Sequence, residues 1–172
     1  MSRILRIIGD LKYGGASLLI GRFTVEAKNA GHEVGVLTTD SIFQDSLREL
    51  GIEVVDLQCI WRETRPVRDL IGLIRLVRYL VRSRWDMVHT HTSKGGVIGR
   101  ISAWFARIPA IIHTTHGFAF HEKSPHWHIR LGAVAERIAA YFCHTIVDVC
   151  YFDCDWAKFL GIGTSEKRVV IP

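Results

Sequence analysis

The sequence has few features that would hold the protein in a membrane or cross-link it by disulfides. No apolar run in its 172 residues reaches the roughly 18 that a spanning helix needs. The N-terminal apolar run, 4–8, is too short for a signal peptide. The four cysteines, Cys59, Cys143, Cys150 and Cys154, form no CxxC pair, which favours free thiols in a reducing compartment. We therefore expect a soluble, cytoplasmic protein, or one that rests on the inner face of a membrane.

Linkers, low-complexity segments and short-period repeats are also missing, so residues 1–172 are expected to form a single domain. The apolar content of 48% and the charged content of 23% are typical of a globular protein. A net charge of +5 and a pI of about 9.2 favour an anionic partner, such as a phosphate, a nucleotide, nucleic acid or an anionic membrane surface.

Short β-branched runs alternate with longer segments at helical spacing. The expected strands cover 4–9, 33–38, 52–57, 86–91, 110–115, 145–150 and 168–171. The expected helices cover 15–31, 41–50, 66–84, 94–107, 124–142 and 153–161. This order predicts an α/β fold with a parallel sheet of about seven strands between two helical layers. Ligands bind such sheets at the carboxyl ends of the strands.

The first such loop carries paired glycines but no complete nucleotide-binding motif. Gly9 and Gly14 match the start of a P-loop, but Gly15 and Ala16 replace its lysine and hydroxyl residues, and GxGxxG is absent. Gly14 and Gly15 lie at an expected helix N-terminus, where free amides favour an anion. A tight strand-to-helix turn without a ligand is the alternative.

The segment DMVHTHTSKGG, 86–96, places two histidines on one face of the fourth strand. His89 lies deeper and is expected to be a hydrogen-bonded core residue, whereas His91 lies near the strand end, where it could face a ligand. Ser93 and Lys94 follow at a helix N-terminus, a combination that suits a phosphate or a sugar. The alternative is a capped helix with an exposed lysine.

The segment HTTHGFAFHEKSPHWH, 113–128, holds five of the nine histidines. It does not form the zinc motif HExxH, because Pro125 stands where the second histidine belongs and also disfavours a helix there. Without other ligands at familiar spacing, we expect no metal site and no metal cofactor.

His116 is the candidate catalytic residue of this cluster. It leaves the fifth strand next to Gly117, where an imidazole can donate to a sugar hydroxyl or a phosphate oxygen. Aromatic side chains follow, Phe118 first, and offer the stacking surface that sugars use. His121 and Glu122 belong to the same expected binding loop, 117–125. The remaining three histidines are expected to be core or exposed bystanders.

The segment 65–85 is strongly amphipathic at about 100° per residue. One arc carries the arginines Arg65, Arg68, Arg75, Arg78 and Arg82. The other arc carries Leu70, Leu73, Ile74, Leu76, Val77, Leu80 and Val81. This pattern predicts a helix packed on the sheet, with a solvated arginine face or with an arginine face that rests on anionic lipid headgroups.

Four motifs, taken together, resemble the N-terminal half of a family 4 glycosyltransferase of the retaining GT-B type. They are Gly14-Gly15-Ala16 with 30–34, Asp86–His91 with Ser93-Lys94-Gly95-Gly96, Thr115–Phe118 with Phe120-His121, and Val169–Pro172. The HGFxFH form looks most like bacterial enzymes that build exopolysaccharide, capsule or O-antigen on a polyprenyl-diphosphate carrier. One departure is Ser17, where the family often has glutamate.

The resemblance implies a Rossmann-like, acceptor-binding half of a GT-B fold. The half that binds the nucleotide-sugar donor, with its two glutamates, is absent from these 172 residues, so the chain alone is expected to be inactive. The resemblance places His116 at the edge of the donor sugar, and Gly14 and Gly15 beside the donor phosphates and acceptor. The acceptor would be a lipid-linked or other saccharide, and no metal would be needed.

The sequence leaves one alternative function open and disfavours two others. A non-catalytic subunit could bind a glycolipid or recruit a separate catalytic partner. A nucleotide-dependent oxidoreductase is disfavoured because the glycine fingerprint is missing. Nucleic-acid binding is disfavoured because the basic residues do not interleave with aromatic ones.

Overall fold

A computed structural model describes residues 1–9, 14–61 and 63–172 of the chain. Its strands are β1 Arg3–Ile8, β2 Glu33–Thr38, β3 Glu53–Val54, β4 Met87–His91, β5 Ala110–Thr115, β6 Thr145–Asp148 and β7 Arg168–Val170. Its α-helices are α1 Gly15–Asn29, α2 Ser41–Glu49, α3 Pro66–Ser83, α4 Ser93–Phe105, α5 His126–Tyr141 and α6 Tyr151–Phe159. A short 3-10 turn, Ser165–Lys167, precedes β7.

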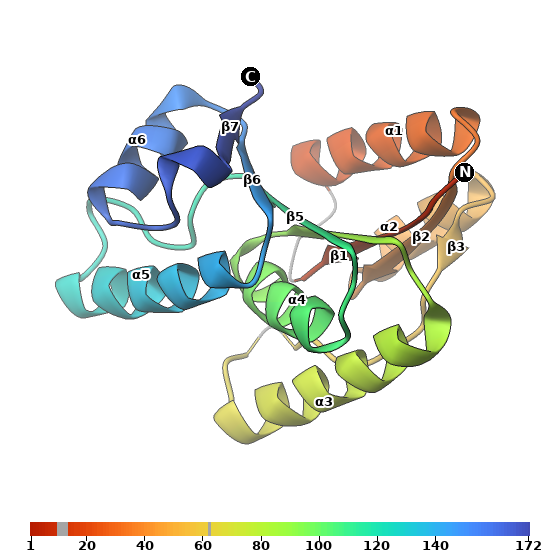
Figure 1. Cartoon of the computed structure of the whole chain (residues 1–172), viewed down its shortest axis with the longest axis horizontal. Coiled ribbons are helices and arrows are strands. Elements are labelled where there is room, and N and C mark those ends of the chain that lie inside the picture. The colour runs from red at the N-terminus through yellow and green to blue at the C-terminus, as the bar shows by residue number, and fades with distance from the viewer. Residues whose placement is uncertain (10–13, 62) are drawn as a thin grey trace.

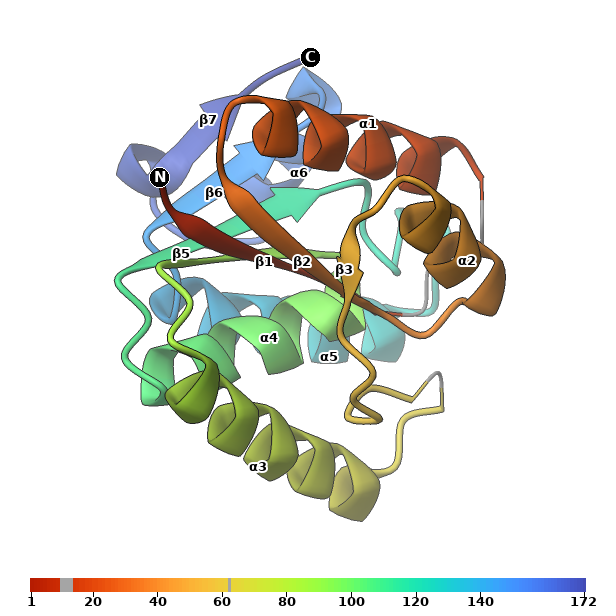
Figure 2. The same ribbon diagram turned by 90° about the vertical axis from the view of Figure 1, so that its right-hand side faces the viewer.

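The seven strands form one sheet in the order β3-β2-β1-β4-β5-β6-β7, and every neighbouring pair is parallel. Helices α1 and α2 cover one face of the sheet, and α3, α4 and α5 cover the other (Figures 1 and 2). The predicted fold class, a Rossmann-like parallel sheet of about seven strands between helical layers, is confirmed.

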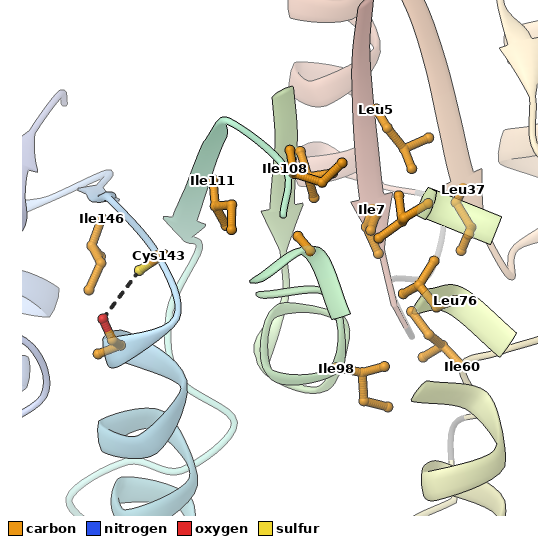
Figure 3. Close-up of a cluster of buried hydrophobic side chains, with 14 of the residues drawn as sticks. Leu5, Ile7, Leu37, Ile60, Leu76, Ile98, Ile108, Ile111, Cys143 and Ile146 are labelled. Atoms are coloured by element: carbon orange, nitrogen blue, oxygen red, sulfur yellow. Dashed lines mark hydrogen bonds between the residues drawn. The ribbon is translucent and has the colours of Figure 1, made fainter. Parts of the chain in front are cut away.

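Two buried apolar clusters hold the layers together. The smaller one joins β1 and β2 to α1 and α2, and Ile20 and Phe43 are among its members. The larger one lies on the opposite face, where side chains of β1, α3, α4, β5 and β6 meet (Figure 3). Ala157 and Leu160 bring α6 into this larger cluster. Strands β1 and β2 therefore contribute apolar side chains to both faces, as expected for a sheet buried between two helical layers.

Most predicted boundaries agree with the structure to within two residues, but the third strand does not. We predicted a strand over 52–57, and the structure has only Glu53–Val54. This strand lies at the sheet edge and pairs only with β2. Val55 still donates to Val36, and Leu57 then turns back to bond Val55. The chain leaves the sheet edge after this turn.

Helix α3 also differs from the prediction on its apolar side. Leu76 and Leu80 are buried, and α3 lies against α4. However, Leu70, Ile74 and Val81 are 59%, 47% and 60% exposed. The predicted apolar arc is therefore only partly packed, because one helix contacts the layer beneath it through a narrower stripe than its apolar residues span.

Two glycines bring the end of β1 against the start of α4. A Cβ at position 95 would lie 2.5 Å from the backbone nitrogen of Gly9 and 2.9 Å from its Cα. In the same place, Gly9 donates its backbone N–H to Oγ1 of Thr92 at 3.2 Å. The backbones of the two segments thus touch, and no larger residue fits at position 95 without movement.

We expect Gly95→Ala to lower the free energy of unfolding by about 1–3 kcal/mol, because the added methyl group must push two backbones apart. Gly15→Ala is the matched control: nothing lies within 4 Å of a Cβ there, so its stability should be unchanged or raised by about 0.4–1 kcal/mol. Chemical unfolding followed by circular dichroism measures both. Equal stability of the two variants would refute the close approach.

Candidate functional site

A cavity of about 610 Å³ opens at the carboxyl ends of β4 and β5. Its walls come from the first turns of α4, the segment after β5 and the inner side of α5. Its lining residues are Ala16, Thr64, Asp69, Thr92, Ser93, Lys94, Val97, Ile98, 116–120, His128, Gly132, Ala135 and Glu136. The cavity is therefore where the parallel sheet predicts a ligand.

His116 lies half-buried in the wall of this cavity. Its Nε2 is 3.1 Å from Nδ1 of His91, the last residue of β4. Burial lowers the pKa of His116, and the charge of Asp153 opposes this shift. His116 is thus a weakly basic imidazole, fixed on one side and facing the cavity, which suits a hydrogen bond to a bound oxygen.

His91 itself is buried, only 2% exposed, and does not line the cavity. His91 reaches the cavity through its contact with His116. Direct binding of a substrate by His91 stays a prediction. Its ring lies 4.3 Å from that of His89, and the two side chains share one side of β4 as predicted. His89 bonds Oγ1 of Thr114 at 2.7 Å and lies 3.3 Å from Nη1 of Arg6, which agrees with the expected core role.

Gly117 turns the chain out of β5 with φ of 88°, a left-handed conformation that glycine adopts without strain. Phe118 follows in the cavity wall, with its ring 5.3 Å from that of Phe120. Phe120 is 2% exposed and sits so close over Gly132 that a Cβ there would collide with its ring. Phe118 is therefore the available aromatic surface, and Phe120 is its buried support.

Ser93 and Lys94 both line the cavity at the N-terminus of α4. Oγ of Ser93 accepts a bond from the backbone N–H of Ala119 at 3.2 Å, which ties the loop after β5 to α4. Nζ of Lys94 lies 2.8 Å from Oδ1 of Asp69 and donates to the backbone oxygen of Glu63 at 2.6 Å. The lysine is thus held against α3 instead of projecting freely.

His121 and Glu122 are exposed and lie apart from the main cavity. They line a second hollow of about 290 Å³ on the side of α6, together with Phe152, Asp153 and Trp156. Gly117, Phe118 and Phe120 border both spaces. The predicted binding loop, 117–125, therefore borders two separate spaces, and only residues 117–120 reach the cavity that contains His116.

Gly14 and Gly15 begin α1, and space around the missing Cβ of Gly15 is open. Ser17 is buried and caps this turn: its Oγ accepts from the Gly14 N–H at 2.7 Å and donates to the Gly14 oxygen at 2.8 Å. Ala16 reaches the cavity wall. The rest of the predicted glycine loop, 10–13, lies outside the described residues.

The sequence reasoning missed a buried ion pair below the cavity. Nη2 of Arg100 lies 2.5 Å from Oε2 of Glu136, and Nε of Arg100 donates to the oxygen of Gly96 at 2.9 Å. Arg100 is the one charged residue within 95–106, and Glu136 is the one acidic residue of α5, and that was the available signal. His128, expected to be a bystander, also lines the cavity, and no sequence pattern indicated this.

Two further observations concern the described residues. They contain no group of three or more His, Cys, Asp or Glu side chains that could hold a metal ion. They also contain no helix that is both long and apolar enough to cross a bilayer.

Comparison with known proteins identifies the family. Residues 14–172 match the sequence profile of the Glycosyl transferase 4-like domain. The chain belongs to this family. The resemblance inferred from the four motifs is thereby confirmed, and the chain is a glycosyltransferase 4-like domain.

Two curated relatives and one solved structure show how much of such proteins the domain covers. The first relative is an Escherichia coli protein named UDP-Gal:alpha-D-GlcNAc-diphosphoundecaprenol alpha-1,3-galactosyltransferase. The two sequences are 48% identical over 59 residues, which cover 34% of this chain and 15% of that protein. The second relative is a Campylobacter jejuni protein named N,N'-diacetylbacillosaminyl-diphospho-undecaprenol alpha-1,3-N-acetylgalactosaminyltransferase. The two sequences are 22% identical over an alignment that covers 95% of this chain and 45% of that protein.

The solved structure is a glycosyltransferase from Rickettsia africae, with a TM-score of 0.74 and 18% identity. The match covers 99% of this chain and 42% of that one. The glycosyltransferase 4-like domain thus spans less than half the length of the Campylobacter jejuni and Rickettsia africae proteins.

The buried histidines make the domain sensitive to acid. Burial lowers the pKa of His89 to about 3, and lowers the pKa values of His91 and His113 well below 6.5. Below pH 6.5 the unfolded chain binds protons that these folded imidazoles do not, so stability falls as the pH falls. Below pH 6.5, each of these histidines lowers the free energy of unfolding by about 1.4 kcal/mol for each pH unit.

We expect His113→Asn to reduce the stability lost between pH 7.5 and pH 5.0 by up to about 2 kcal/mol. Asparagine places an amide where Nδ1 of His113 contacts Oγ1 of Thr90 at 3.0 Å, so packing is largely kept while the proton site is removed. Urea unfolding at both pH values measures the difference. His126→Gln, at an exposed histidine, should show the full wild-type loss, and an equally large loss in His113→Asn would contradict the assignment.

Proposed function

We propose that this domain is the acceptor-side half of a retaining glycosyltransferase. The complete enzyme would move a sugar from a nucleotide-sugar donor to a lipid-linked or saccharide acceptor in the synthesis of a cell-surface polysaccharide. The observation that carries the proposal is the cavity at the carboxyl ends of β4 and β5, with His116 and Phe118 in its wall. The names of the two relatives, both transferases that act on undecaprenol-linked sugars, support the lipid-linked acceptor.

The chemistry divides between the two halves. A second half of the fold would hold the nucleotide, and charge on the departing diphosphate would be stabilised by fixed donors in the cleft. On this side, His116 offers a ring N–H to an oxygen of the reacting sugar, and Phe118 offers an aromatic surface for a pyranose ring. Catalysis needs both halves, so this chain alone does not turn over. No metal is part of the proposal.

The acceptor would reach the cavity from a membrane on which α3 rests. Arg75, Arg78 and Arg82 line a hollow of about 650 Å³ beside Gln58, and all three side chains are exposed. Apolar residues of α3 lie exposed next to this arc, Val67 among them at 72%. An arginine row beside an apolar strip suits the interface between headgroups and acyl chains of an anionic bilayer. Arg65 and Arg68 extend the row.

A second candidate function is a non-catalytic subunit that recruits a separate catalytic partner. It is favoured by an exposed apolar stripe along α5, whose members recur every three or four residues. They are Trp127, Leu131, Val134, Ile138 and Tyr141. A recruiting subunit would not depend on the cavity histidine, so a single substitution at His116 separates the two functions.

In a complete enzyme that contains both halves, we expect His116→Ala to lower kcat about 100-fold or more, because one donor to the reacting sugar is lost. Transfer of radiolabelled sugar to a polyprenyl-diphosphate-linked acceptor measures this. His126→Ala is the control, since His126 is exposed outside the cavity lining. Wild-type turnover in His116→Ala would overturn the catalytic assignment and leave the recruiting function as the better account.

We expect the triple variant Arg75→Gln, Arg78→Gln, Arg82→Gln to bind anionic vesicles roughly 100-fold less tightly, at about 1 kcal/mol for each basic residue near the surface. The partition coefficient is measured by co-sedimentation with vesicles that contain roughly one-third phosphatidylglycerol, an anionic lipid. Neutral phosphatidylcholine vesicles should bind neither protein.

The control for net charge is a second triple variant, Arg22→Gln, Arg48→Gln, Lys158→Gln. These side chains are exposed on α1, α2 and α6, away from α3. It should bind anionic vesicles like the wild type. Equal weakening in the two triple variants would mean that overall charge, and not the arginine face of α3, drives the binding.

A further inference from the structure

The contact between His91 and His116 restricts where each ring can carry its proton. Nδ1 of His91 and Nε2 of His116 are 3.1 Å apart, so one nitrogen must donate and the other must accept. A neutral imidazole has only one N–H. The choice made in this contact therefore decides which nitrogen of His116 is left to act as a donor or an acceptor in the cavity.

The two possible arrangements differ in what happens at Nε2 of His91. This atom is fully buried and has no hydrogen-bond partner among the described residues. If Nδ1 of His91 accepted, its proton would have to sit on Nε2, as a buried N–H without an acceptor. Buried donors without a partner are rarer and more costly than unfilled acceptors. Placing the proton on Nδ1 of His91 leaves only an unfilled lone pair at Nε2.

We propose that His91 is a positioning residue that donates its Nδ1–H to Nε2 of His116 and thereby holds His116 in the form protonated at Nδ1. His116 then presents a permanent N–H donor to an oxygen atom in the cavity. This role differs from direct substrate binding by His91. Its use in sugar transfer rests on the proposed function, but the proton arrangement itself does not.

The surroundings of His91 keep it neutral and fixed. Its ring packs against His89, and the charged guanidinium of Arg6 lies behind that ring. No carboxylate is among the groups that shift the pKa of His91; burial dominates, and His89, Arg6, His116 and His113 add to it. A residue at the end of a central strand, paired with β1 and β5, has little freedom to turn.

Nothing in the described part of the chain competes for the other nitrogen of His116. Within that part of the chain, His116 makes its hydrogen bond to His91 through Nε2, and its side chain lines the cavity. Nδ1 is therefore the nitrogen left for a ligand. A donor at this position recognises acceptor oxygens, such as those of a sugar ring, a hydroxyl or a phosphate.

The test is a long-range proton–nitrogen NMR correlation of the 172-residue chain with nitrogen-15-labelled histidine, at pH 7.5. His116→Gln assigns the signals. The couplings between each ring nitrogen and the protons on the ring carbons report directly which nitrogen carries the proton. We expect His116 to be protonated at Nδ1, whereas free histidine prefers Nε2. A wild-type His116 protonated at Nε2 overturns the proposal, whatever any variant does.

Two substitutions of His91 separate positioning from packing. His91→Leu fills the space but cannot donate, so His116 should revert to the Nε2-protonated form. His91→Asn places an amide N–H near the position of Nδ1 and should restore the Nδ1-protonated form. If both variants fold and behave alike, the donor role is refuted. If His91→Leu does not fold, the wild-type spectrum still decides.

Failure of this proposal and failure of the proposed function are distinguishable. Normal sugar transfer by His116→Ala would remove the catalytic role and leave the proton arrangement unchanged. An Nε2-protonated His116 would refute the arrangement and leave the transferase function standing.

Discussion

The close approach of β1 to the first turn of α4 is the constraint on which the site depends. Gly9 bonds Thr92 through its N–H and accepts a bond from Oγ1 of Thr39 at 3.1 Å, so three loops at the carboxyl edge meet at one residue. The absence of a side chain at Gly95 lets the backbones touch. This contact fixes the start of α4 at the carboxyl edge of the sheet, and the cavity is the space left between that turn, the β5 loop and α5.

The polar groups inside the domain serve two different ends. Arg6, His89 and His91 form a row on the α1 side of the sheet that leads to His116 at the cavity. Arg100 and Glu136 form a neutralised pair below the cavity, between α4 and α5. Buried groups of this kind are costly unless they are paired, so they are retained where they orient something. Here the row orients a cavity histidine, and the pair closes the cavity floor without leaving a net charge there.

Membership of the glycosyltransferase 4-like family sets the cavity in the context of longer proteins. The chain spans less than half the length of the Campylobacter jejuni and Rickettsia africae proteins that it matches. Under the proposed function, this cavity would be one wall of a cleft, and a second wall would be needed to enclose a nucleotide-sugar. The exposed apolar residues on α3 and α5 belong to the same helical layer as α4, but they do not line the cavity and so face away from it.

The sequence by itself determined the order of the elements, the parallel sheet and the family, because β-branched runs, helical spacing and glycine-marked turns are local signals. It also indicated His116 and Phe118, since residues just after a parallel strand lie at the ligand edge. Only the tertiary structure decided that His91 is buried behind His116, that Lys94 is held by Asp69, and that His121 and Glu122 line a different hollow. Those facts depend on which side chains from distant segments meet, and local periodicity carries no information about such pairs.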